Sequence, residues 1–181
     1  MDGIGFDVGG TWSDRLDAAV SASLRIDAGL IAPHIRPLLS VSVFHSRYAA
    51  DEIQKIEDRL TALVVDPTGQ ARVVIDDITL TNVTLDLDLQ YVFAVGRVTP
   101  FFGLGMGVHV RNAAGPAIAG TILEEALQAI VAAGNATAGF EVRVNPAFHL
   151  TAEVRGVVAS GLADLSLRGG AMLRFPGRRG G

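Results

Sequence analysis

Hydrophobic and polar residues alternate along about eight separate segments of this chain. Period-two alternation is typical of a β-strand with one apolar and one polar face. It is clearest at residues 82–95, where apolar side chains alternate with Thr84, Asp86, Asp88 and Gln90. The other segments are 4–12, 16–30, 35–45, 101–111, 138–144, 148–157 and 165–175. Several of them reach the roughly 9 to 11 residues that a tilted membrane strand needs.

The connections between these segments differ in length from one end of the strands to the other. Tight turns are expected at residues 32–34, 95–100 and 145–147, where Pro and Gly supply the backbone angles that turns use. Long links are expected at 49–81 and 112–137, and they alternate with the tight turns. Membrane barrels of the bacterial outer membrane have this sidedness, with short periplasmic turns and longer outer loops.

Both long links contain patterns of their own. At 120–135, Thr121 and Glu124 have capping-box spacing, an apolar stripe follows, and Gly134 is a suitable stop, so a short helix is predicted. In the first link, apolar residues at helical spacing predict one or two helical turns, at Ile53, Ile56, Leu60 and Leu63. Residues 66–69 resemble a hairpin turn, which keeps ten strands open as an alternative to eight.

The distribution of charge decides which face of the strands lies inside. An ionised side chain that faces lipid at mid-bilayer costs roughly 2 to 4 kcal/mol, so a membrane barrel should confine its charges to one parity. The charged residues of this chain are confined to one parity, and His45 is the one titratable residue on an apolar face. We therefore expect the polar face to line a narrow lumen that is filled by side chains.

The polar face carries equal numbers of acids and arginines and no lysine. Arginine suits buried multidentate pairing, and a closed lumen has to be nearly neutral because unpaired buried charge is strongly unfavourable. The predicted lumen charge network consists of Asp7, Asp17, Asp27, Asp86, Asp88, Glu141, Glu153, Arg25, Arg36, Arg111, Arg143, Arg155, Arg168 and Arg174.

Aromatic residues on the apolar faces are expected to form two girdles at the membrane interfaces. Five of them are placed toward the tight turns, namely Phe6, Phe93, Phe102, Phe148 and Phe175. Two are placed toward the long links, namely Trp12 and Phe140.

The composition is compatible with one domain over residues 1–181, with a barrel at about 3–175 and a short polar tail at 176–181. Although 49% of residues are hydrophobic, no window contains the roughly 20 apolar residues of a membrane-spanning helix. The net charge of -4 offers no basic footprint, so nucleic acid is not expected as a partner. The absence of cysteine excludes disulfides and thiolate chemistry. No secretory signal is visible at the N-terminus, so an exported protein would be represented here by its mature form.

Residues 99–110, 139–156 and 165–175 carry a resemblance to the small outer-membrane β-barrels of Gram-negative bacteria, the OmpA-like and OmpX-like eight-stranded domains. The resemblance implies an all-β, closed, antiparallel up-and-down transmembrane barrel, with both termini periplasmic and short helices in the long outer loops. It also implies contact with membrane lipids and lipopolysaccharide, and insertion by the barrel-assembly machinery. That machinery commonly reads a terminal aromatic residue, which Phe175 matches, although the tail at 176–181 departs from the pattern.

Several chemical interpretations compete with this structural one. The glycine row of Gly103, Gly105 and Gly107 could suggest a phosphate loop, but it continues as a strand where such a loop needs a helix N-terminus. The predicted reason for these glycines is that they leave room in the lumen for charged side chains of neighbouring strands. His45, His109 and His149 lie on three strands, with His45 on the other face, so no metal site or catalytic triad is predicted.

The preferred hypothesis is a non-enzymatic outer-membrane barrel with a structural, adhesion or surface-interaction role. It has no cofactor, its lumen conducts poorly, and loops 49–81 and 112–137 are possible sites for a surface partner. One alternative is a lipid-modifying barrel enzyme, for which His45 and Ser46 are candidates although adjacent parities direct them to opposite faces. The other is a soluble lipocalin-like ligand-binding barrel.

Overall fold

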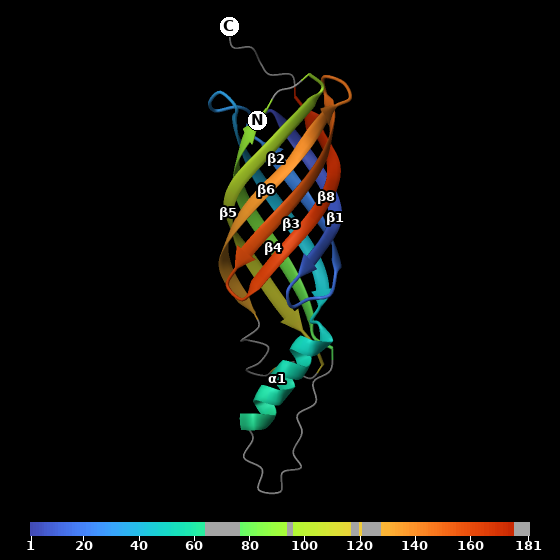
Figure 1. Ribbon diagram of the computed structural model, residues 1–181, viewed down its shortest axis with the longest axis vertical. Helices are drawn as coiled ribbons and strands as arrows, with labels where there is room; N and C mark the ends of the chain where they lie inside the picture. The colour runs from blue at the N-terminus through green and yellow to red at the C-terminus, as the bar shows by residue number, and fades with distance from the viewer. Residues whose placement is uncertain (64–76, 94–95, 117–119, 121–127, 176–181) are drawn as a thin grey trace, which may run out of the picture.

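Eight antiparallel strands close into a single barrel (Figure 1). The computed structural model describes all residues except 64–76, 94–95, 117–119, 121–127 and 176–181. The chain runs up and down between neighbouring strands, and β1 pairs with β8 to close the sheet. The strands are β1 (Gly3–Ser13), β2 (Ala19–Asp27), β3 (Ile35–Arg47), β4 (Thr79–Val92), β5 (Val98–Ala114), β6 (Ala129–Arg143), β7 (Phe148–Ala159) and β8 (Leu162–Arg174). The predicted fold class and the preferred count of eight strands are confirmed.

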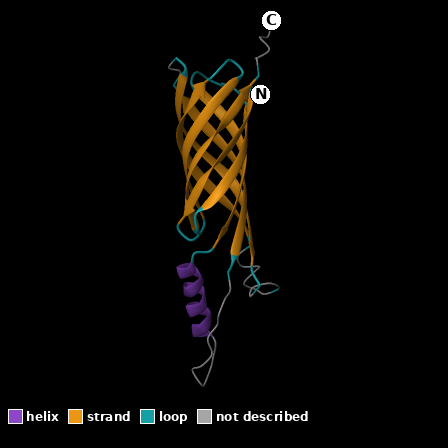
Figure 2. Cartoon of the chain, turned by 90° about the vertical axis from the view of Figure 1, so that its right-hand side faces the viewer, coloured by secondary structure: helices purple, strands orange, loops and turns teal. Residues whose placement is uncertain are grey.

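The two ends of the barrel have different architecture. One end, which we call the turn end, carries the start of β1, the end of β8 and the short links β2–β3, β4–β5 and β6–β7 (Figure 2). Positive φ angles at Gly29 and His34 bend the β2–β3 turn, and Gly96 does so in the β4–β5 turn. The other end, which we call the loop end, carries the short β1–β2 and β7–β8 links and the long links at 48–78 and 115–128.

The strand register places side chains of alternating parity inside and outside the barrel. In β4, Asp86, Asp88 and Gln90 are buried, while Leu85 and Leu87 are about half exposed. Neighbouring strands extend each face, since Leu87 pairs with Met106 and Asp88 pairs with Gly105. The result is a continuous apolar outer wall around a polar interior.

One α-helix, α1 (Ala50–Leu63), lies at the loop end after β3. It extends the one or two turns predicted from its apolar spacing to 14 residues, with Asp51 and Glu52 in its first turn, where carboxylates favour the helix dipole. Within the described residues, no helix is long and apolar enough to cross a membrane. The hairpin predicted at residues 66–69 lies outside the described residues.

The second predicted loop helix is wrong in its C-terminal part. Residues 121–127 lie outside the described part of the chain, but Ile130 and Gly134 belong to β6, which begins at Ala129. The stretch 129–138 is rich in Ala and Gly at both parities, so hydropathy alternation is weak there. The loop is therefore shorter than the predicted link of 112–137.

Two apolar layers cross the lumen. Toward the turn end, Leu38, Phe101 and Met172 are buried inside the barrel, and Leu38 and Met172 lie one inward position deeper than the charged Arg36 and Arg174 of the same strands. At the loop end a buried cluster forms the mouth, consisting of Leu16, Phe44, Ile78, Leu80, Ala113 and Leu162. Residues Tyr48, Ile53, Ile56 and Leu60 pack against that cluster, so α1 is anchored by its apolar stripe. Apolar layers thus alternate with charged groups along the interior, which extends the prediction of a lumen filled by charges.

Candidate functional site

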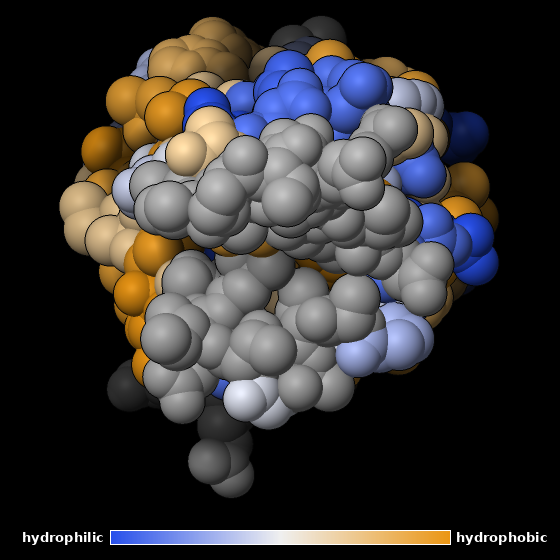
Figure 3. Space-filling view, turned by 90° about the horizontal axis from the view of Figure 1, so that it is seen from below, coloured by the Kyte–Doolittle hydropathy of each residue, from blue (hydrophilic) through white to orange (hydrophobic). Residues whose placement is uncertain are grey.

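The outer wall is the first feature that indicates function. The side chain of Leu87 is 52% exposed and that of Met106 is 73% exposed, and outward residues of all eight strands behave similarly. Figure 3, which looks onto the loop end, shows hydrophobic side chains along the flank and hydrophilic ones gathered on one side of the loop end. Water-soluble monomers rarely expose contiguous apolar patches of more than a few hundred Å². His45 lies on this wall and shares a hydrogen bond with Thr81, with Nδ1 and Oγ1 3.0 Å apart.

The charged side chains of the interior form three connected groups. The group nearest the turn end centres on Glu141, which accepts from Arg36 at 2.8 Å and from Arg174 at 2.7 Å. Arg174 also pairs with Asp27, and the His149 Nδ1 atom lies 2.5 Å from a Glu141 oxygen. One carboxylate is thus shared by two guanidinium groups and a histidine from β3, β8 and β7.

The second group lies in the middle of the barrel around Arg25 of β2. Its guanidinium contacts Asp7 of β1 and donates to Glu153 of β7 at 2.8 Å. Thr151 completes the group, because its hydroxyl donates to Asp7 at 2.8 Å. The side chain of Arg168, partly buried nearby, donates to the Ser42 hydroxyl at 3.3 Å.

The third group lies toward the loop end and joins β4 to β7. The Nη2 atom of Arg155 lies 2.6 Å from Asp88 Oδ1, and both side chains are almost completely buried. The other carboxylate of β4, Asp86, accepts from Thr84 at 3.1 Å, and His109 Nε2 lies 3.7 Å from it. Pairs between buried arginine and carboxylate satisfy charges that would otherwise be prohibitive inside a barrel.

The glycine row of β5 faces this charged interior. A Cβ atom at Gly105 would overlap Asp88 Oδ1, and one at Gly107 would overlap Asp86 Oδ1. At Gly103 it would lie 2.9 Å from the side chain of Gln90 and from Thr137 Oγ1. The three glycines therefore provide the space that the polar side chains of β4 occupy, and they form no loop.

Two members of the predicted network lie elsewhere. Asp17 is exposed because β2 begins only at Ala19, and the break in alternation before it buries Leu16 in place of Asp17. Arg143 is exposed at the rim, where its Nη2 donates to the Gly96 carbonyl at 3.4 Å. Arg111 is half-buried at the mouth, and donates to the Ser160 carbonyl at 2.8 Å.

Several buried polar residues were absent from the predicted network. His149 and Gln90 contact Glu141 and Arg36 respectively, and Asp164 is buried near the mouth. Their signal was present in the sequence, because each shares the parity of charged residues in its own strand. Counting acids and arginines alone leaves out His149 and Gln90, and Asp164 falls just before the predicted segment 165–175, whereas β8 begins at Leu162.

The aromatic residues gather mainly at the turn end. Phe140 was predicted at the long-link side, but β6 begins so early that Phe140 pairs with Pro100 near the start of β5. Tyr91, Phe93 and Phe102 are in mutual contact there, with ring centroids 4.9 to 6.0 Å apart. Trp12 lies near the end of β1 that faces the loop end of the barrel. The exposed aromatics of the predicted girdle are Phe6, Trp12, Phe93, Phe102, Phe140 and Phe175, and Phe148 is partly buried.

The residues considered for catalysis do not converge. His45 faces outward, whereas Ser46 is buried and donates to the Asp17 carbonyl at 2.6 Å. Within the described ranges, no group of three or more His, Asp or Glu side chains is placed to hold a metal ion.

Comparison with known proteins shows the fold. No family model and no curated protein matches the sequence. Among solved structures, Neisserial surface protein A is 11% identical with a TM-score of 0.63, over 96% of each chain. Ail of Yersinia pestis, in complex with the heparin analogue sucrose octasulfate, is 13% identical with a TM-score of 0.51, over 97% of this chain and 100% of that one.

A third solved structure is the N-terminal β-barrel domain of Pseudomonas aeruginosa OprF. It is 10% identical with a TM-score of 0.50, over 97% of this chain and 98% of that one. All three are eight-stranded outer-membrane barrels. The predicted resemblance to small outer-membrane barrels is confirmed at the level of the fold.

Proposed function

We propose that this protein is an integral barrel of a bacterial outer membrane with a structural, adhesion or surface-interaction role. The observation that carries the proposal is the opposition of its two faces. The wall exposes apolar side chains on every strand, while buried arginines and carboxylates pair inside. This arrangement is favourable only if the surroundings of the wall are apolar. Water would stay in contact with the apolar side chains, which is unfavourable, whereas a lipid bilayer covers them.

The orientation follows from the two ends of the barrel. Both termini and the short turns belong on the periplasmic side, and α1 with the long links belongs on the outer surface. Membrane lipids and lipopolysaccharide are then the immediate surroundings of the wall. Phe175, whose backbone N–H donates to the Asp2 carbonyl at 2.8 Å, extends the closing strand and suits recognition by the barrel-assembly machinery.

A non-enzymatic role fits the position of the polar groups. The buried charges neutralise one another, and two apolar layers cross the lumen, so the barrel should conduct ions poorly. His45 and Ser46 face opposite sides of the wall, which does not favour the lipid-modifying alternative. The long links are the parts of the chain that a surface partner would reach. The complex of Ail with a heparin analogue supports a sulfated ligand as a class to test there.

The proposal is tested by the behaviour of the purified chain in detergent and in water. We expect β-rich circular dichroism only in detergent or lipid, and a folded band on an unheated gel that shifts its migration after boiling. A monodisperse folded preparation in detergent-free buffer would contradict membrane placement and favour the soluble barrel. Mass spectrometry of lipid A incubated with the protein tests the enzyme alternative, since unchanged acyl chains are expected.

A further inference from the structure

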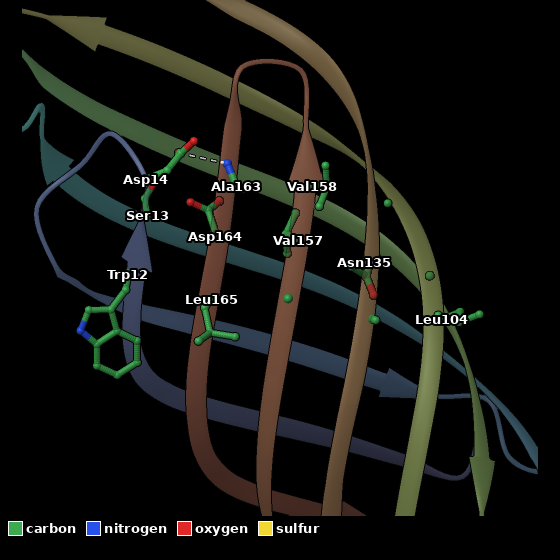
Figure 4. A pocket seen from close by; sticks show the side chains of 14 residues that line it. Trp12, Ser13, Asp14, Leu104, Asn135, Val157, Val158, Ala163, Asp164 and Leu165 are labelled. Atoms are coloured by element: carbon green, nitrogen blue, oxygen red, sulfur yellow. Dashed lines mark hydrogen bonds between the residues drawn. The ribbon is translucent and has the colours of Figure 1, made fainter. Parts of the chain in front are cut away.

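The outer wall contains a groove of about 860 Å³ near the loop end (Figure 4). Five strands form it, and their pairing places one outward residue of each in a row across the sheet. The row consists of Trp12, Leu165, Gly156, Ala136 and Leu104, on β1, β8, β7, β6 and β5. Gly156 and Ala136 are small, and Leu165 and Leu104 on either side of them are large, so the wall is hollowed between two apolar ridges.

The glycines of this groove differ from those of the lumen. Among the residues that the structure describes, a Cβ atom at Gly134 or Gly156 would have no neighbour within 4 Å, whereas one at Gly107 would meet Asp86. No contact with this part of the chain therefore requires glycine at the two outward positions. Glycine in a strand interior also weakens the strand and often marks a close approach by a ligand. The empty space lies on the outside of the barrel, where something else can fill it.

Positive charge lies beyond the loop end of the same groove. An exposed side chain, Arg15, brings its Nη1 atom to within 3.8 Å of the Cβ position at Gly161, in the β7–β8 turn. Arg111 holds the adjacent Ser160 carbonyl at 2.8 Å. The nearby Asp14 carboxylate accepts from the Ala163 N–H at 3.1 Å. An amphiphile that lies in the groove would thus have a guanidinium group within reach of its polar end.

We propose that the groove holds an acyl chain of lipid A, the phosphorylated multi-chain lipid of the outer leaflet, with a phosphate at Arg15. This inference rests on the proposed function, because it requires the wall to lie in a membrane with the loop end outward. A single acyl chain can follow a narrow groove between ridges. The convex wall of a second barrel would rest on Trp12 and Leu104 without reaching the floor.

The single tryptophan of the chain allows a direct test, because Trp12 forms one ridge of the groove. The protein is placed in nanodiscs of brominated phosphatidylcholine, whose acyl chains quench indole fluorescence, and unlabelled lipid A is added in steps. Bulk lipid mixing reduces quenching in proportion to the mole fraction of lipid A. Preferential occupation of the groove reduces it by more than that proportion.

Variants separate the groove from the rest of the wall. Gly156→Leu fills the floor, while Gly169→Leu is a matched control, because its outward Cβ has one protein neighbour, at 3.9 Å, and it lies outside the groove. Gly134→Leu provides a second filling variant. We expect the excess protection by lipid A to be lost in both filling variants and retained in Gly169→Leu. Arg15→Gln should weaken the preference for lipid A over its dephosphorylated form.

The outcomes distinguish this inference from the proposed function. If brominated lipid does not quench Trp12 at all, membrane placement itself fails. If quenching occurs but follows the mole fraction of lipid A, the groove has no preference and the inference is overturned. Protection that appears without lipid A and grows with the protein-to-lipid ratio would assign the groove to a second copy and would also overturn it. Equal protection in Gly156→Leu, Gly134→Leu and the wild type would place the lipid elsewhere.

Discussion

Arg36 of β3 and Glu141 of β6 meet across the interior of the barrel, with 2.8 Å between Nη1 and Oε2. Three strand-to-strand steps separate them around the wall, and 105 positions separate them in the sequence. Both side chains are buried, so their pairing depends on closure of the whole sheet. The contact links the pattern of charges in the sequence to the stability of the closed barrel.

Replacing Glu141 should therefore destabilise the folded state strongly. Glu141→Gln leaves Arg36 and Arg174 with too little negative charge, and loss of one partner of a buried pair costs about 3 to 5 kcal/mol. Urea unfolding in lipid vesicles, followed by the heat-dependent gel shift, measures this loss. Arg143→Gln on the same strand is the control, because that side chain is exposed at the rim. A similar unfolding midpoint for both variants would mean that the network contributes little.

The two kinds of glycine should respond oppositely to a methyl group. At Gly107 a Cβ would overlap the Asp86 side chain and the Leu85 carbonyl, so Gly107→Ala should lose about 1 to 3 kcal/mol of folding stability. At Gly169 the nearest atom would be 3.9 Å away, and alanine there should be neutral or stabilising by up to about 1 kcal/mol. The same vesicle unfolding assay compares them. Equal destabilisation would contradict the assignment of inner and outer glycines.

Anchoring of α1 is expected to depend on its apolar stripe. Ile56 packs against the cluster at the loop end, so Ile56→Asp should release the helix without unfolding the barrel. Limited proteolysis should then cleave between residues 50 and 63 faster, while the barrel keeps its heat-dependent migration. Gln54→Asp, at an exposed position of the same helix, serves as the control. Unchanged cleavage in Ile56→Asp would mean that the packing does not hold α1.

Much of this fold could be predicted because a barrel strand repeats its faces every two residues. The alternation at Leu85, Asp86, Leu87 and Asp88 fixes both the strand and its inner face. The same rule failed at the start of β6, where Ala and Gly occur at both parities. There the helical spacing that ends at Ile130 was the stronger pattern in the sequence.

The interior could be predicted less completely than the wall. The parity of Phe44 and Leu38 is that of the lumen, yet hydropathy alone does not reveal apolar layers inside a polar face. Individual partners such as Arg155 and Asp88 were also beyond the sequence, because they depend on how far each strand is shifted along its neighbours. A balanced count of charges predicts that pairs form, but it does not identify them.

The most direct test of the central claim compares a charge on the two faces of β4. Leu87→Arg places a guanidinium on the wall, where it should cost about 2 to 4 kcal/mol at mid-bilayer and greatly reduce insertion into vesicles. Gln90→Glu places a charge on the inner face beside Arg36, which already donates to Gln90 at 2.8 Å, so insertion should continue. The measurement is the fraction of urea-unfolded protein that acquires the folded gel mobility after dilution into lipid vesicles. Efficient insertion of Leu87→Arg, equal to that of Gln90→Glu, would contradict a lipid-facing wall.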